Sequence, residues 1–390
     1  MRRVMDQAGV FGTEVKSTLY VAIELSRSSW VVALLAPGAR RPSRHRLEAG
    51  DVEGLLALIA RHRASAARVS SCYEAGYEGF WLHRHLQAAG IDSRIVDPSS
   101  LRVDRRARRR KTDAIDAETI LRALIAWDRG ERDQCSMVRV PDVAPEDARR
   151  DSRERERLIK EQTGHLNRIR GLLTAMGIYD FNPRKTDRLE LLAGLMTGDG
   201  RPLPERLSLE IRREIERLSL VERQIAELER ARRKPAPRGR PRKDAPPQPA
   251  PDLATSDGRI RHLQRLRGVG PDIASVLHNE VFYRSFANRR EVAAYCGLDP
   301  TPFASGNLRR EQGISKAGNR RARHAAIELA WLWLQWQPDS ALARWFHDRI
   351  GPATRRLKRV MIVALARKLV IALWRFLHSG TMPEGAVLKA

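Results

Sequence analysis

Two aspartates directly follow the most cationic segment of the sequence. In the stretch RRRKTDAIDAE, residues 108–118, Asp113 and Asp116 begin a helical pattern that continues as TILRALIAW. A spacing of three residues places both carboxylates on one face of a helix, so both can reach the same cation. The structural alternative is helix capping, because Asp113 at the N-cap and Asp116 in the first turn both interact favourably with the helix dipole.

Two further carboxylates lie within or at the end of predicted strands. Glu24 falls inside the apolar run YVAIELS, and Glu74 ends the run VSSCYE. A charged side chain in such a place normally needs a partner. Four carboxylates that converge repel one another unless a divalent metal neutralises them. Glu24, Glu74, Asp113 and Asp116 are therefore candidate ligands of a two-metal phosphoryl-transfer site.

The overall charge favours an anionic partner. The 390 residues include 72 Lys and Arg against 47 Asp and Glu, a net charge of +25. Such a balance favours nucleic acid, with an anionic membrane as the competing partner. The apolar stretch from Val360 is interrupted by Arg367, Lys368 and Arg375, which indicates an amphipathic helix and not a membrane span. Residues 1–15 lack the apolar core of a signal peptide, so we expect a cytoplasmic protein that binds no membrane.

The charge run itself is a candidate phosphate-binding segment. Seven of the ten residues from Arg102 to Lys111 are cationic. A solvated face is the alternative, but next to an acidic metal site the run favours contacts with a phosphate backbone, which position a duplex without reading its sequence. The predicted contacts are Arg105, Arg106, Arg108, Arg109, Arg110 and Lys111.

The chain divides into four predicted parts. Residues 18–143 have an α/β pattern, with a hairpin over 18–36, helices over 52–62 and 79–90, and strands over 67–75 and 91–98. Apolar residues at three- and four-residue spacing over 144–233 predict long antiparallel helices or a coiled coil. Residues 234–258, rich in proline and basic charge, predict a disordered linker. Residues 259–379 predict a second, mainly α-helical domain. Three widely spaced cysteines argue against disulfides and zinc sites: Cys72, Cys135 and Cys296.

The sequence GVGP in the second domain contains Gly268 and Gly270 between two helical patterns. It resembles a helix-hairpin-helix turn, in which glycines let backbone N–H groups approach a phosphate, but a simple helix-to-helix connection has the same pattern. Further along, Trp331, Trp333 and Trp336 are able to stack on bases, although their helical spacing favours packing.

The first domain resembles the resolvase-like, RNase H-like domain of the DEDD transposases of the IS110 family of bacterial insertion sequences. The resemblance rests on the order of a strand-borne acid, EAGY and KTDAIDA. It implies that the four acidic positions of the family fall on Glu24, Glu74, Asp113 and Asp116, and that these bind Mg²⁺ or Mn²⁺. The sequence departs at the first position, where glutamate replaces aspartate. The additional methylene can shift a bound metal enough to impair catalysis.

The second domain resembles the C-terminal domain of the same family. An F-x6-A-x3-G-L-x-P run from Phe286 precedes Ser305-Gly306 and the segment ISKAGN. The resemblance implies that Ser305 is the nucleophile; no neighbouring residue is an obvious base, which suits a site shared with the metals of the first domain. Ser315 is the rival hydroxyl, with a position better suited to an N-cap. A basic helix start is predicted to bind phosphate oxygens through Lys316, Asn319, Arg320, Arg321 and Arg323.

These features predict a DNA transposase or recombinase that acts by metal-assisted serine transesterification. The resemblance implies double-stranded donor and target DNA, a bridge RNA that pairs with both, a dimer or tetramer, and a location in the cytoplasm at the nucleoid. Two alternatives remain open at this point. A Holliday-junction-type nuclease uses the same carboxylates with water and does not need Ser305. A transposase relative disabled at Glu24 binds nucleic acid without cutting it.

Overall fold

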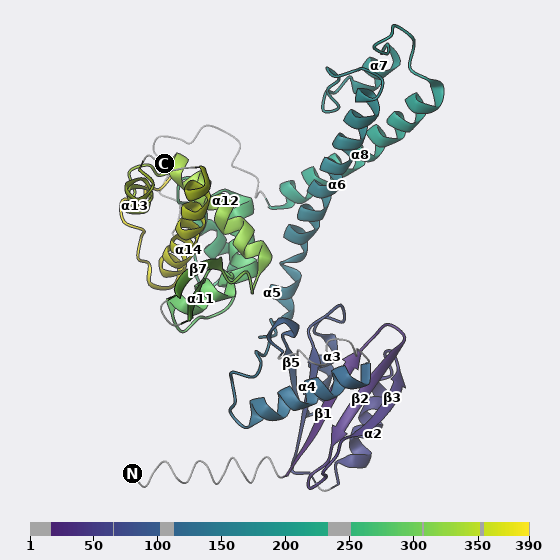
Figure 1. Cartoon of the computed structure of the whole chain (residues 1–390), viewed down its shortest axis with the longest axis vertical. Helices are drawn as coiled ribbons and strands as arrows, with labels where there is room; N and C mark the ends of the chain where they lie inside the picture. The colour runs from purple at the N-terminus through teal and green to yellow at the C-terminus, as the bar shows by residue number, and fades with distance from the viewer. Residues whose placement is uncertain are drawn as a thin grey trace. The chain divides into compact units, whose positions relative to one another are not determined.

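The computed structural model describes residues 17–64, 66–101, 113–232, 251–305, 308–351 and 355–389, with only the backbone described at 113–114, 232, 303–305, 308–311 and 355. The chain forms two compact units, Met1–Pro141 and Asp142–Ala390 (Figure 1). The predicted basic segment at 102–111 lies outside the described residues. So does most of the predicted linker, whose last residues already belong to a helix that starts at Ser256.

The first unit is built on a five-stranded mixed sheet with the order β3-β2-β1-β4-β5. The strands are β1 (Thr18–Leu25), β2 (Ser29–Leu35), β3 (Ser43–Glu48), β4 (Arg68–Glu74) and β5 (Asp92–Val96). β1 is antiparallel to β2 and parallel to β4, and β5 is parallel to β4. The predicted hairpin and both later strands are confirmed. β3 was not predicted, because its sequence SRHRLE is largely polar and exposed, as suits an edge strand.

Helices cover both faces of this sheet. α2 (Val52–His62) and α3 (Trp81–Ala88) pack on the face that carries Leu19, Val21 and Ile23. α4 (Asp113–Asp128) packs on the opposite face, against Tyr20 and Ala22, and lies in front of the strands in Figure 1. A one-turn 3₁₀ helix, η1 (Pro98–Ser100), follows β5. Because strand side chains alternate between faces, every second residue of β1 points toward α4.

The second unit begins with a helical arm. After the short α5 (Val143–Asp147), α6 (Arg150–Thr174) and α8 (Glu205–Arg232) lie side by side, with α7 (Arg188–Ala193) between them in the chain (Figure 1). A hydrogen bond joins His165 to Glu214 and an ion pair joins Arg168 to Glu210, so later residues of α6 meet earlier residues of α8. The predicted long antiparallel helices are confirmed. The arm has a small core of its own, which includes Ile169.

The rest of this unit is mainly helical, as predicted. Its helices are α9 (Ser256–Gln264), α10 (Pro271–Leu277), the π-helix η2 (His278–Phe282), α11 (Arg289–Tyr295), α12 (Arg320–Trp336), α13 (Ala341–Ile350) and α14 (Arg355–Ser379). Trp333 is buried in its core, whereas Trp331 and Trp336 are nearly half exposed. The packing interpretation is therefore confirmed for Trp333. No helix in the described part of the chain is long and apolar enough to cross a bilayer. The three cysteines are free and buried.

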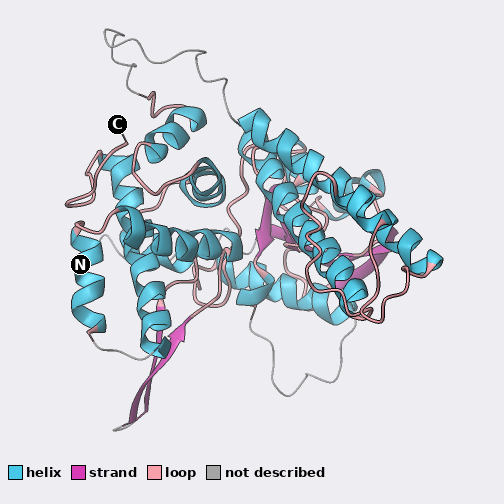
Figure 2. Cartoon of the chain, turned by 90° about the horizontal axis from the view of Figure 1, so that it is seen from above, coloured by secondary structure: helices cyan, strands magenta, loops and turns pink. Residues whose placement is uncertain are grey.

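A two-stranded hairpin in this unit was not predicted. β6 (Pro300–Ser305) pairs antiparallel with β7 (Leu308–Ile314), with an irregular register between Pro300 and Pro302. Figure 2 shows the hairpin extending away from the helices. Its sequence, PTPFAS followed by LRREQGI, is rich in proline and charge, so it lacks the apolar alternation that marks a buried strand.

Candidate active site

Two of the predicted metal ligands lie at the same edge of the sheet. β1 and β4 are parallel neighbours that pair as far as Ile23 with Tyr73, and Glu24 and Glu74 are the next residues of the two strands. Both fall in the alternation that includes Ala22 and points toward α4. The parallel pairing therefore brings two glutamates to the carboxyl end of adjacent strands, on one face.

α4 runs against these strands, so its first turn lies toward the same edge. Its last residue, Asp128, forms an ion pair with Arg68, the first residue of β4. Nearer its start, Glu118 bonds Arg44, whose strand position is level with Ala22 through the pairing across β2. Asp113 and Asp116 precede Glu118 on the helix, so they lie at the end of α4 nearer this edge.

An ion-pair cluster around the buried Asp128 fixes the C-terminal end of α4. The Asp128 side chain is 4% exposed and bonds Arg68, with Arg94 at 3.9 Å, and Arg94 also bonds Asp92 at 2.8 Å. Burial raises the pKa of Asp128, and the two arginines only partly offset this, so the pKa lies above its ordinary value. The cluster anchors the helix at the opposite end from the proposed ligands.

The donor set is chemically suited to a hard divalent cation, because it consists of carboxylate oxygens alone. Among the side chains that the structure describes, no three His, Cys, Asp or Glu are grouped closely enough to hold a metal ion. Asp113, at the start of α4, has a side chain outside the described ones.

Sequence reasoning assigned no role to two neighbours of this edge. Tyr77, three residues after Glu74, is 99% exposed, and the Arg27 guanidinium lies 5.8 Å from the centre of its ring. A cation and an open aromatic face suit a phosphate and a base of nucleic acid. The signal in the sequence was the tyrosine of EAGY, but only the structure shows that its ring is exposed.

Ser305 is the last residue of β6, opposite Leu308, at the end of the hairpin where the chain reverses. Its side chain lies outside those described. The residue therefore ends a strand, directly before the point where the hairpin turns.

The GVGP segment connects α9 to α10, as predicted. Gly268 has φ +83°, and a Cβ there would lie 3.0 Å from the Cβ of Trp336. Its glycine is thus explained by close packing on α12. Gly270 is the residue before α10, in extended conformation. A phosphate contact by these two glycines stays a prediction.

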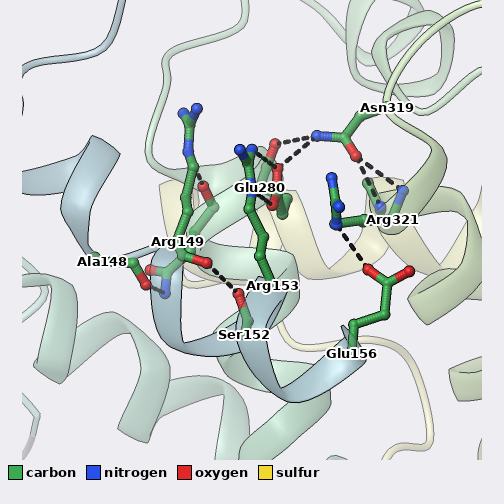
Figure 3. A network of polar contacts seen from close by, with 10 residues as sticks. Ala148, Arg149, Ser152, Arg153, Glu156, Glu280, Asn319 and Arg321 are labelled. Atoms are coloured by element: carbon green, nitrogen blue, oxygen red, sulfur yellow. Dashed lines mark hydrogen bonds and ion pairs between the residues drawn. The ribbon is translucent and has the colours of Figure 1, made fainter. Parts of the chain in front are cut away.

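A buried polar network joins the start of α6 to the helical domain (Figure 3). Glu280, 1% exposed on η2, accepts two bonds from Arg153 at 2.9 and 3.1 Å and one from Asn319 Nδ2 at 2.9 Å. Nearby, Arg321 bonds Glu156 at 2.7 Å. Burial raises the pKa of Glu280, but the bonds from Arg153 and Asn319 outweigh it, so the pKa lies below its ordinary value. Sequence reasoning did not single out Glu280.

The predicted basic helix start is the beginning of α12, whose N-cap Asn319 belongs to the same network. Asn319, and not Ser315, caps α12, since its Oδ1 accepts from the N–H groups of Arg321 and Ala322. The N-cap prediction for Ser315 is therefore wrong: its hydroxyl donates to Asp299 at 2.6 Å. Lys316 and Arg320 are exposed, whereas Arg323 donates to the Lys316 carbonyl at 3.0 Å. Phosphate contacts by these residues stay predictions, and Asn319 already has internal partners.

Comparison with known proteins covers most of the chain. A family model described as "Transposase IS116/IS110/IS902 family" matches residues 260–345, and the model DEDD_Tnp_IS110, described as "Transposase", matches residues 21–178. The chain is 46% identical over 383 residues to "Putative transposase y4rJ" of Sinorhizobium fredii, covering 95% of this chain and 94% of that protein. The chain belongs to the IS110 family of transposases. The resemblance stated from the sequence is confirmed.

Two more distant relatives of this IS110-family chain are also described as transposases. It is 28% identical to "Probable family 20 transposase" of Pseudomonas aeruginosa, over 78% of this chain and 82% of that one. It is 24% identical to "Transposase for insertion sequence element IS1328" of Yersinia enterocolitica, over 77% of this chain and 81% of that one. IS110-family transposases cut and rejoin DNA, so DNA is a partner, and the DEDD type uses divalent metal ions.

Proposed function

We propose that this IS110-family protein is a DNA recombinase that moves an insertion sequence by metal-assisted serine transesterification. The observation that carries the proposal is the placement of Glu24, Glu74 and the first turn of α4 at one edge and on one face of the sheet. The strand order, with three antiparallel strands, β1 to β3, beside the parallel strands β4 and β5, supports a resolvase-like, RNase H-like assignment.

The four carboxylates would hold Mg²⁺ or Mn²⁺. Such ions, when bound, stabilise the charge that develops on the attacking and leaving oxygens of a phosphoryl transfer. Glu24 and Glu74 are carried by the backbone of paired strands, so their Cα positions are fixed, whereas Asp113 and Asp116 depend on how α4 is anchored. The longer side chain of Glu24, compared with aspartate, changes only the reach of one ligand.

Ser305 would be the nucleophile. Its hydroxyl gives up a proton as Oγ forms a bond to the scissile phosphorus, the bond from phosphorus to the leaving DNA oxygen breaks, and that oxygen takes up a proton, so no net proton is released. One phosphoester replaces another, so the reverse step rejoins DNA without ATP. The position of Ser305 at the end of a protruding hairpin supports access to a bulky substrate.

The nucleic-acid partners would be donor and target duplexes and a bridge RNA whose base pairing selects them. The cationic residues Arg105–Lys111 and the exposed Lys316 and Arg320 would contact phosphates. Family resemblance supports the RNA and a dimer or tetramer that acts at the nucleoid.

The decisive experiment is a search for the covalent intermediate. The protein is incubated with Mg²⁺, DNA and RNA transcribed from the flanks of its gene, and the products are separated on a denaturing gel. We expect a protein–DNA adduct that is lost in Ser305→Ala. Cleavage that persists in Ser305→Ala without an adduct would instead indicate a Holliday-junction-type nuclease.

Glu24→Asp tests whether the natural residue limits the reaction. We expect the wild-type protein to be active and Glu24→Asp to change its rate only modestly. If the wild type forms no adduct with any RNA and Glu24→Asp does, the natural protein is a disabled nucleic-acid-binding relative.

A further inference from the structure

The helical domain contains a basic cavity that the proposed reaction does not use. It has a volume of about 560 Å³ and lies between α11, the start of α13, α14 and the segment that follows α14. Five cations line it: Arg289, Arg290, Arg367, Lys368 and Arg375. One carboxylate, Glu384, is also present. The matched family model ends at residue 345, before α14 begins.

These cations outnumber the single carboxylate of the cavity, Glu384, five to one. Within the described part of the chain, none of the five forms an ion pair with Asp or Glu, and Arg367 Nε is buried without a hydrogen-bond partner. Arg367 and Arg375 are eight residues apart on α14 and share one face of the helix with Ile371. Like charges held together in this way are unfavourable unless an anion binds among them.

A second hollow of about 500 Å³ continues the first and adds an aromatic wall. The two share Arg289, Arg375 and Thr381. Trp374 and His378, one turn apart on α14, line the second hollow, and their rings are nearly parallel, with centres 5.7 Å apart. Cations that follow a backbone, beside aromatic rings on which bases stack, are the usual elements of a single-strand binding site.

We propose that this basic cavity binds a single-stranded segment of nucleic acid. Phosphates lie against Arg289, Arg367 and Arg375, and a base stacks on the Trp374–His378 pair. The volume is that of a small-molecule site, which suits a nucleotide or two. Three cations interrupt the apolar pattern of α14, and all three line this cavity: Arg367, Lys368 and Arg375. The proposal thus assigns them a function.

The test compares two charge-matched double variants of the full-length protein. Arg289→Gln/Arg375→Gln removes two exposed cavity cations, and Arg356→Gln/Arg359→Gln removes two exposed cations of α14 that do not line the cavity. Binding of labelled oligo(U), oligo(dT) and a short DNA duplex is measured in EDTA over a salt series. Because no metal is present, the result does not depend on the carboxylates or on Ser305.

We expect the cavity variant to bind the single strands about tenfold more weakly and to lower the salt slope by about 1.4, the value for two lost contacts. The control variant and the duplex arm should change little. Loss with oligo(U) alone identifies RNA as the ligand, and equal loss with oligo(dT) identifies any single strand. Equal weakening in both variants, or in the duplex arm, would overturn the proposal. Trp374→Leu should weaken single-strand binding without changing the salt slope. A thermal unfolding midpoint equal to that of the wild type is the control that this variant folds.

Discussion

Each unit contains one nearly buried carboxylate that holds an element in place, and the two carboxylates are held very differently. In the first unit, Asp128 anchors α4 through Arg68 and Arg94, and its pKa is raised because burial dominates. In the second, the carboxylate of Glu280 accepts hydrogen bonds from two guanidinium nitrogens of Arg153 and from the side-chain amide of Asn319, and its pKa is lowered. Burial alone therefore does not decide whether a carboxylate stabilises its surroundings in the ionised form. The number and direction of its donors decide.

The largest effect on activity is expected at Asp116, a predicted metal ligand in the first turn of α4. Asp116→Asn should lower DNA cleavage at least about a thousandfold, because it removes a ligand of the metal that would stabilise the charge developing in the transition state. Cleavage of DNA in the presence of Mg²⁺ is the measurement. The control is Glu118→Gln, on the same helix and paired with Arg44 at the surface. Equal losses in both variants would mean that α4 contributes through its fold and not through Asp116.

The second effect concerns the carboxylate with the lowered pKa. Glu280→Gln should lower the free energy of unfolding of the second unit by about 2–3 kcal/mol, because it removes the charged acceptor of three hydrogen bonds, while water still solvates part of Arg153, which is 43% exposed. Urea unfolding followed by tryptophan fluorescence measures this. Glu156→Gln, which breaks the exposed pair with Arg321, should cost about 1 kcal/mol or less. A Glu280→Gln cost as small as that of the control would show that the network adds little.

Acid should destabilise the second unit in two steps. Burial holds the pKa of His278 at about 4, compared with 6.5. The unfolded chain thus binds the proton first, and stability falls as pH drops from about 6.5 to 4, by about 3 kcal/mol in total. The lowered pKa of Glu280 has the same sign but acts below its ordinary value of 4.5. His278→Gln should remove the upper step only, as measured by unfolding at a series of pH values; an unchanged profile would contradict the assignment.

The smallest effect is expected at the carboxylate with the raised pKa. Asp128→Asn should cost about 1 kcal/mol, since the ionised form is only partly compensated in the folded protein. The measurement is the unfolding of the first unit. A cost comparable to that of Glu280→Gln would remove the difference between the two carboxylates.

Much of the fold was predictable because local patterns determine it. The apolar runs of β1, β2, β4 and β5 and the periodicity of α6 and α8 predict their own elements. β3 and the β6–β7 hairpin have no such pattern, because they are stabilised by pairing with a neighbouring strand. Glu280 was missed for a similar reason: its partner Arg153 lies 127 residues earlier in the chain.

The sequence by itself determined the family, the identity of the four carboxylates and Ser305 as candidates, and the strongly basic character of the chain. Only the tertiary structure decided that Glu24 and Glu74 share one face, that α4 runs toward them, and that Arg289 joins the cations of α14 around one cavity. The reason is physical. Residue type and spacing act locally, whereas strand pairing, helix direction and cavities arise from contacts between residues far apart in the chain.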